Sequence, residues 1–105
     1  MTQYIQLQQT PSQVFNIVLN EQNCTLKIYQ KRGKTFSSLY IDDKVIFEGI
    51  LIHSFQGFKP ANYLNFDGDL AFFDLYGSDD PDFNKYNDRF ELNYLTNEEY
   101  EYIFN

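Results

Sequence analysis

Apolar and polar side chains alternate with a period of two through much of the first half of the chain. Between residues 13 and 19, Phe15, Ile17 and Leu19 fall on one face and the intervening side chains on the other. This alternation is typical of a β-strand, whose successive side chains point to opposite faces. The same period continues through residues 24–31, 35–41 and 45–52. No apolar set with helical spacing persists here, so the pattern predicts four strands.

Short polar turns at residues 20–23, 32–34 and 42–44 separate these four segments. Gly33 in the second turn can adopt a positive φ without steric cost. Connections of this length force neighbouring strands to pair antiparallel, because a parallel crossover needs about a dozen residues. We therefore expect a four-stranded meander. Its last strand is predicted to present Val45, Phe47, Gly49 and Leu51 on one face.

A short strand is predicted at residues 4–7, with Ile5 and Leu7 on one face. Because proline cannot donate to a strand ladder, this strand should lie at a sheet edge or end before Pro11. Residues 53–64 contain Gly57 and Pro60 and are interpreted as a loop. The aromatic residues of this loop are expected to cover the core; they are Phe55, Phe58 and Tyr63.

Two strands are predicted in the second half, at residues 70–76 and 89–94. The first follows an Asp67-Gly68 turn signal and has apolar residues on both faces, which favours a central position in a sheet. An acidic irregular segment, residues 77–88, separates the two strands. At the C-terminus, Thr96 and Glu99 match a helix capping box, whereas Tyr100, Tyr102 and Phe104 also alternate as in a strand. The pattern leaves both structures open there.

These elements predict one β-rich domain over residues 1–105. The expected fold class is all-β: a mainly antiparallel sandwich or partly open barrel of about seven strands, either with or without a short C-terminal helix. Tyr100, Tyr102, Ile103 and Phe104 are apolar for a chain end. We expect residues 96–105 either to form a partner-docking tail through these four side chains or to pack back on the same domain.

Composition narrows the function classes. The net charge of −7 argues against nucleic acid and against anionic membranes as partners, because both require a basic surface. Aromatic residues make up 19% of the chain, and all are Phe or Tyr; Tyr suits half-buried strands and protein interfaces. The lone Cys24 lies on an apolar strand face and is expected to be buried. The N-terminal residues show no basic region or long apolar run, so synthesis and folding in a cytoplasm are expected.

No residue cluster predicts catalysis or a cofactor. The acidic segment offers oxygen ligands for a calcium site, since its Asp79, Asp80, Asp82 and Asp88 could combine with Asp67 and Asp69. The segment lacks the EF-hand order, so a solvated acidic loop is the preferred interpretation. Paired carboxylates for glycoside hydrolysis and a site based on His53 also lack supporting residues. We therefore predict no enzyme activity, no cofactor and no metal site.

The order of segments from Ile5 to Leu95 resembles that of the small baseplate plug proteins of contractile-tailed phages, a family typed on a cyanophage baseplate. Order and spacing together carry the resemblance, and no single motif does. The segments are Ile5-Gln6-Leu7 with Pro11, residues 13–19 and 22–30, Leu39-Tyr40-Ile41-Asp42, Phe47-Glu48-Gly49-Ile50, residues 63–70 with Phe73-Asp74, Asp79-Asp80-Pro81-Asp82-Phe83 and residues 89–95.

The resemblance implies a virion structural protein of the tail baseplate, made in the host bacterial cytoplasm. Such a protein would close the distal end of the tail tube or fill space among hub proteins until contraction. Its partners would be other hub and tube proteins, together with further copies of itself in the particle. The alternative is a small carbohydrate- or ligand-binding module that uses the loops at residues 55–63 and 77–88.

Overall fold

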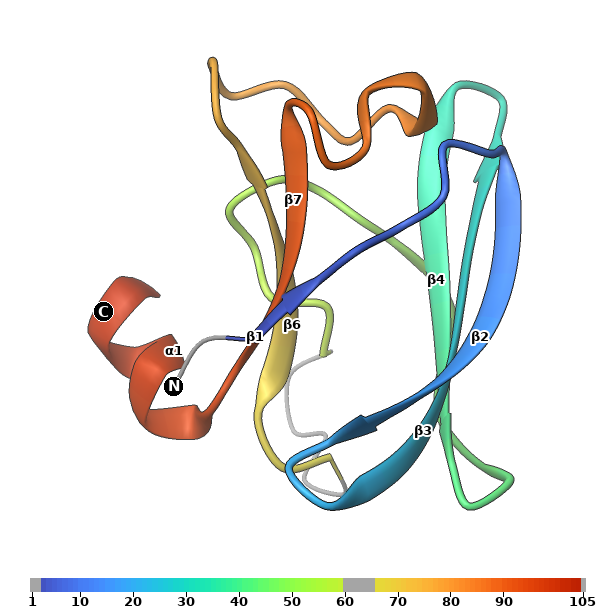
Figure 1. The fold of residues 1–105 in the computed structure, drawn as a ribbon, viewed down its shortest axis with the longest axis vertical. Helices are drawn as coiled ribbons and strands as arrows, with labels where there is room; N and C mark the ends of the chain where they lie inside the picture. The colour runs from blue at the N-terminus through green and yellow to red at the C-terminus, as the bar shows by residue number, and fades with distance from the viewer. Residues whose placement is uncertain (1–2, 60–65, 105) are drawn as a thin grey trace.

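The computed structural model describes residues 3–59 and 66–104, and these contain seven strands, one 3-10 turn and one α-helix (Figure 1). The elements are β1 (Gln3–Ile5), β2 (Ser12–Leu19), β3 (Gln22–Lys31), β4 (Lys34–Ile41), β5 (Lys44–Leu51), β6 (Asp69–Asp74), η1 (Phe83–Lys85), β7 (Phe90–Leu95) and α1 (Asn97–Phe104). One antiparallel sheet has the order β2-β3-β4-β5 and the other β1-β7-β6. The predicted all-β, mainly antiparallel fold of about seven strands is confirmed.

The four-stranded sheet is the predicted meander, and its three connections are two-residue turns. Both central residues have positive φ in Asn20-Glu21, Arg32-Gly33 and Asp42-Asp43. This is the mirror-image turn geometry whose twist matches that of the flanking strands. The first turn is shorter than the predicted polar cluster, because β3 already begins at Gln22.

The predicted face of β5 is wrong, because a bulge interrupts the period of two. The register between β4 and β5 shifts on both sides of Leu39, and Gly49 has a φ of 63°. The amide of Gly49 donates to the Ser38 hydroxyl at 2.8 Å instead of to a ladder carbonyl. As a result, the adjacent residues Ile46 and Phe47 are both buried, whereas Val45 and Leu51 are exposed.

The three-stranded sheet joins the two ends of the chain. β1 pairs only with β7 and lies at the sheet edge, as predicted, while β7 occupies the centre. The predicted central position of β6 is wrong, because β7 is its only strand partner among the residues that the structure describes. The other edge of β6 is covered by the segment after β5, since the amides of Phe55 and Phe58 donate to the carbonyls of Phe72 and Leu70. This segment accounts for the burial that the sequence pattern assigned to a neighbouring strand.

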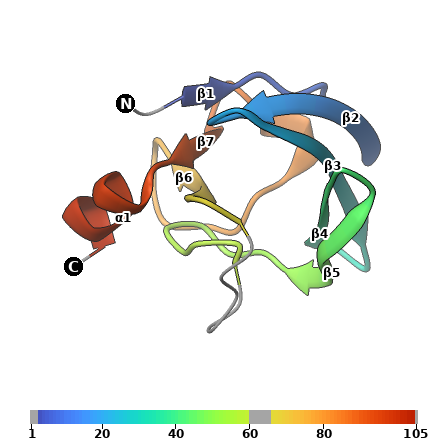
Figure 2. The ribbon, with the colours of Figure 1, turned by 90° about the horizontal axis from the view of Figure 1, so that it is seen from below.

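The core lies between the two sheets (Figure 2). Phe58, one of the predicted covering aromatics, is 3% exposed and packs on Phe47 and Phe72. Phe55 is 44% exposed and contacts Phe73 on the outer side of β6 instead, so its predicted place over the core is wrong. The third, Tyr63, lies outside the described residues. No helix among the described residues is long and apolar enough to cross a membrane.

The C-terminus is a helix, and the predicted capping box opens it. The amide of Thr96 donates to the Glu99 carboxylate at 3.0 Å, and the amide of Glu99 donates to the Thr96 hydroxyl at 3.2 Å. These bonds satisfy two of the amides that an α-helix leaves without a partner at its N-terminus. The helix lies over the outer face of β6, where the ring of Phe104 stacks on that of Phe73 at 6.1 Å.

Candidate partner surfaces and the acidic segment

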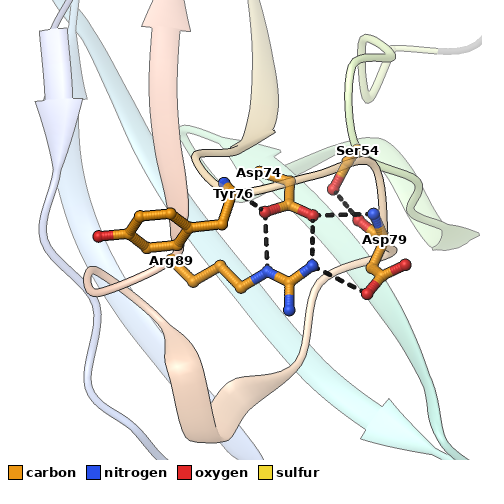
Figure 3. A network of polar contacts seen from close by, with 5 residues as sticks. All are labelled: Ser54, Asp74, Tyr76, Asp79 and Arg89. Carbon is orange, nitrogen blue, oxygen red and sulfur yellow. Dashed lines mark hydrogen bonds and ion pairs between the residues drawn. The ribbon is translucent and has the colours of Figure 1, made fainter.

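The acidic segment is fastened by an ion pair between Asp74, the last residue of β6, and Arg89 (Figure 3). The guanidinium Nε and Nη2 donate to the two carboxylate oxygens at 2.8 and 2.9 Å, and the Asp74 side chain is fully buried. Asp74 also accepts from the amides of Tyr76 and Asp79. The hydrogen bonds from Arg89 hold the pKa of Asp74 well below its usual range and raise that of Arg89. This bidentate, charge-assisted pair therefore closes the loop that connects β6 to β7.

Other groups of the acidic segment bind the rest of the domain. The Asp79 carboxylate accepts from Arg89 at 2.8 Å, and the Asp79 carbonyl accepts from the Ser54 hydroxyl at 2.6 Å (Figure 3). His53 contacts Asp80 at 3.0 Å. Asp82 caps η1 by accepting from the amide of Asn84. These bonds give the carboxylates a structural role at the edge of the fold.

The six carboxylates considered for calcium do not come together. Asp67 lies at the opposite end of the domain and accepts from Asn20 and Asn97. Asp69 accepts from the backbone amides of Lys59 and Leu70. Within residues 3–59 and 66–104, no group of three or more His, Cys, Asp or Glu side chains is arranged to hold a metal ion. The calcium hypothesis therefore has no ligand cluster in the described part of the chain.

The buried side chains of Asp69 and Cys24 have altered pKa values. Burial raises the pKa of the Asp69 carboxyl to about 6, partly offset by the hydrogen bonds that it accepts. Burial also raises the pKa of the Cys24 thiol to about 11, so this thiol is protonated at neutral pH. A protonated, buried thiol is a poor nucleophile. The prediction that Cys24 is buried is confirmed.

The four predicted interface residues fall on two sides of α1. Tyr100 and Phe104 pack on each other, with ring centroids 4.8 Å apart, and Phe104 stacks on β6. Tyr102 is 90% exposed and Ile103 45% exposed. A surface groove of about 380 Å³ is lined by Glu98, Glu99, Tyr102 and Ile103. One side of the helix thus packs on the domain, as one of the two expectations had it, and the other side faces outward; docking on a partner stays a prediction.

A second exposed apolar surface was not predicted. It is the outer face of the four-stranded sheet, where Val14 and Val18 of β2 are 59% and 58% exposed and Val45 and Leu51 of β5 are also exposed. Between them Tyr29 and Phe36 stack at 5.7 Å. Apolar residues on both faces of β2 were the available sequence signal. The inward set, Phe15, Ile17 and Leu19, carried the strand prediction, and Val14 and Val18 on the other face mark this surface.

The fold and its surfaces define a small two-sheet β domain. Hydrogen bonds and ion pairs hold its loops, and apolar side chains are exposed on two of its sides. Exposed apolar faces of this kind are typical of surfaces that contact other proteins.

A family model described as "Cyanophage baseplate Pam3 plug gp18" matches residues 2–98, and the chain belongs to this family. No curated protein matches the sequence significantly. The resemblance noted from the sequence is confirmed, and with it a structural role in a phage tail baseplate, in contact with other baseplate or tail proteins. The family match ends at residue 98, so most of α1 lies beyond it.

Proposed function

We propose that the protein occupies the axis of the baseplate, where it closes the distal end of the tail tube or fills the space among the hub proteins until contraction. The family match over residues 2–98 is the observation that carries this proposal. The polar fastening at both ends of the domain supports it. Asp74 and Arg89 close one end, and Asp67 joins the β2–β3 turn to α1 at the other. Bonds at both ends of the domain suit a protein whose role is to fill a space and keep its shape there.

The protein is proposed to act without turnover. Its strongest ion pair, Asp74 with Arg89, is used to hold a loop, and Asp79 is tied to the same guanidinium. His53 and Asp80 contact each other at the surface, with 44% and 60% of their side chains exposed. In these contacts the aspartates stabilise the loop structure, which supports a structural role for them.

We further propose that residues 96–105 dock on a partner through Tyr102 and Ile103, while Tyr100 and Phe104 keep the helix on the domain. Large aromatic side chains are favoured at the centres of protein interfaces. The division of α1 into a packed side and an exposed side supports this assignment. Asn105 lies outside the described residues.

The placement is tested on particles of the phage that encodes the chain. Mass spectrometry of purified particles should detect the protein, and cryo-electron microscopy should show density at the distal end of the tube that disappears when the gene is deleted. A protein absent from particles, or one located away from the tail axis, would overturn the proposed placement.

The docking tail is tested with Tyr102→Ser and Ile103→Ser in the same phage. Both side chains are exposed, so the thermal midpoint of the isolated protein should not change, while its amount in particles should fall several-fold. Phe104→Ala is the matched control, because it should lower the thermal midpoint by removing the stack on Phe73. Normal incorporation of both outward variants would exclude the tail as an interface.

A further inference from the structure

The outer faces of the two sheets differ in what covers them. α1 covers part of the outer face of the three-stranded sheet, with Phe104 against Phe73. No element among residues 3–59 and 66–104 lies over the outer face of the four-stranded sheet, as Figures 1 and 2 both show. Val14, Val18, Val45 and Leu51 are therefore left at the surface. This face, together with the adjoining β3–β4 turn, is called the bare face below.

The bare face is basic toward the β3–β4 turn, although the chain as a whole is acidic. Lys27 places its ammonium over the ring of Tyr29, 5.1 Å from the centroid. Lys31, Arg32 and Lys34 are exposed at the tip of the β3–β4 hairpin. The ion pairs of the described residues join His53 to Asp80 and Arg89 to two aspartates, and they do not involve this group. The acidic residues of the same sheet lie away from the β3–β4 turn: Glu21 is in the β2–β3 turn, Asp42 and Asp43 are in the β4–β5 turn, and Glu48 accepts from the Tyr40 hydroxyl.

The exposed side of α1 has the complementary composition. The helix contains Glu98, Glu99 and Glu101 and no Lys or Arg. Its groove of about 380 Å³ places the exposed Glu98 beside the Tyr102 ring and the Ile103 side chain, and Glu99, which also lines it, closes the capping box. A lysine or arginine fits such a groove, because its aliphatic stem can lie along apolar groups while its charged head meets a carboxylate or an aromatic face.

The two surfaces lie on opposite sides of the molecule. In both views α1 is at one side and β3 and β4 are at the other (Figures 1 and 2). One copy therefore cannot bring its own helix onto its own bare face. A second copy can do so, and it would match acidic to basic and apolar to apolar across the contact.

We propose that α1 of one copy docks on the bare face of the next copy, in a head-to-tail contact. This inference rests on the proposed axial position. A tail axis is polar, so equivalent copies around it meet through two different surfaces, as in heterologous interfaces. The chain carries two different, complementary surfaces of this kind. A neighbouring baseplate protein is the competing occupant of the bare face, and the experiment below separates the two.

The test uses two charge-reversal variants of the full chain. The sheet variant carries Lys27→Glu and Lys31→Glu, which lie on the outer face of β3. The helix variant carries Glu98→Lys and Glu101→Lys, which are exposed on α1. Sedimentation equilibrium of the wild type up to about 1 mM, a range that detects weak contacts, should show a mass that rises with concentration. Each variant should weaken self-association at least tenfold at an unchanged thermal midpoint.

Mixing the two variants gives the decisive result. The sheet variant retains an intact helix and the helix variant retains an intact bare face, and the two reversed surfaces are again opposite in charge. An equal mixture should therefore recover the self-association that each variant alone has lost. Lys85→Glu and Glu21→Lys are matched controls, because both residues are exposed outside the two surfaces and should leave the wild-type mass profile unchanged.

Three results would overturn the head-to-tail contact: a wild type that stays monomeric, variants that associate normally, or a mixture that forms no dimer although the wild type associates. If the protein is monomeric in solution but present in particles, another baseplate protein would be the occupant of the bare face, and the proposed function would stand. If the protein self-associates but is absent from particles, the head-to-tail contact would stand and the proposed function would be overturned.

Discussion

The two sheets of this protein differ in how their strands find each other. In the four-stranded sheet every strand pairs with its neighbour along the chain through a two-residue turn. In the three-stranded sheet β1 pairs with β7, so that Gln3 lies opposite Tyr94. Closing a loop of this length costs conformational entropy before any contact can compensate for it.

In the three-stranded sheet, side-chain hydrogen bonds join segments that are too far apart in the sequence to be connected by a tight turn. The amide and carbonyl of Leu7 both bond the Asn87 side chain, at 3.0 and 2.6 Å, and the Tyr4 hydroxyl donates to the same side chain. Asn87 thus continues the pairing of β1 beyond its last strand residue. Together with Asp74 and Arg89, it shows that the polar residues of this half hold distant segments in place. The comparison predicts that the three-stranded half is the more sensitive to substitution.

The largest effect is expected at Phe72 in β6. Its buried ring contacts Phe58 at 5.8 Å and Tyr86 at 5.5 Å, which belong to the two irregular segments beside the sheet. Phe72→Ala should lower the free energy of unfolding by about 3 to 5 kcal/mol, measured by urea denaturation. Phe36→Ala on the bare face is the matched control and should cost about 1 kcal/mol, the value of an aromatic pair. Equal costs would show that the bare face is as tightly packed as the core.

The second largest effect is expected at Gly68, just before β6. Its φ is 92°, and a Cβ there would meet the Tyr94 hydroxyl and lie 2.6 Å from the Leu95 carbonyl oxygen. Gly68→Ala should therefore cost about 2 to 4 kcal/mol, from backbone strain and overpacking combined. Gly33 in the β3–β4 turn has a φ of 75° but open space around it. Gly33→Ala should cost about 1 kcal/mol, and a smaller difference between the two variants would mean that the backbone near Gly68 can move.

The same contrast explains which features the sequence could predict. The hairpins were predictable because turn residues and alternation are local signals. The cover of β6 was not, since it depends on the amides of Phe55 and Phe58 bonding strand residues 17 and 12 positions further along the chain. The bulge at Gly49 needs the Ser38 hydroxyl across the sheet, and the Asp74–Arg89 pair spans 15 positions. For α1, the capping box was visible, but the choice of outward side chains depends on Phe73 beneath the helix.

A pH effect of intermediate size is expected from Asp69 at the start of β6. Its pKa in the folded protein is raised to about 6, whereas an unfolded aspartate titrates near pH 4. The folded state therefore binds this proton more tightly, and its contribution to stability should grow as the pH falls from about 7 to about 4, by at most about 3 kcal/mol. Asp69→Asn should flatten this part of the stability profile. An unchanged slope in the variant would mean that another group causes it.

Asp74 should act in the opposite direction at lower pH. Its pKa in the folded protein is held below the usual range, mainly by hydrogen bonds from Arg89. Its stabilising contribution is therefore complete above pH 4 and is lost as the pH falls below that value. Urea denaturation at several pH values separates the two groups, because they act in different windows and with opposite signs.

The smallest effect is expected at Thr96, where α1 begins. The Thr96 hydroxyl accepts from the amide of Glu99 at 3.2 Å, so Thr96→Ala should lower the free energy of unfolding by about 1 kcal/mol. Thr96→Ser keeps the hydroxyl and should cost much less. In Thr96→Ala, hydrogen exchange should accelerate in α1 before it does in β6, because the helix covers only the outer face of that sheet. If α1 keeps its protection in the variant, the stack of Phe104 on Phe73 rather than the cap holds the helix in place, and the covered outer face depends on the aromatic contact alone.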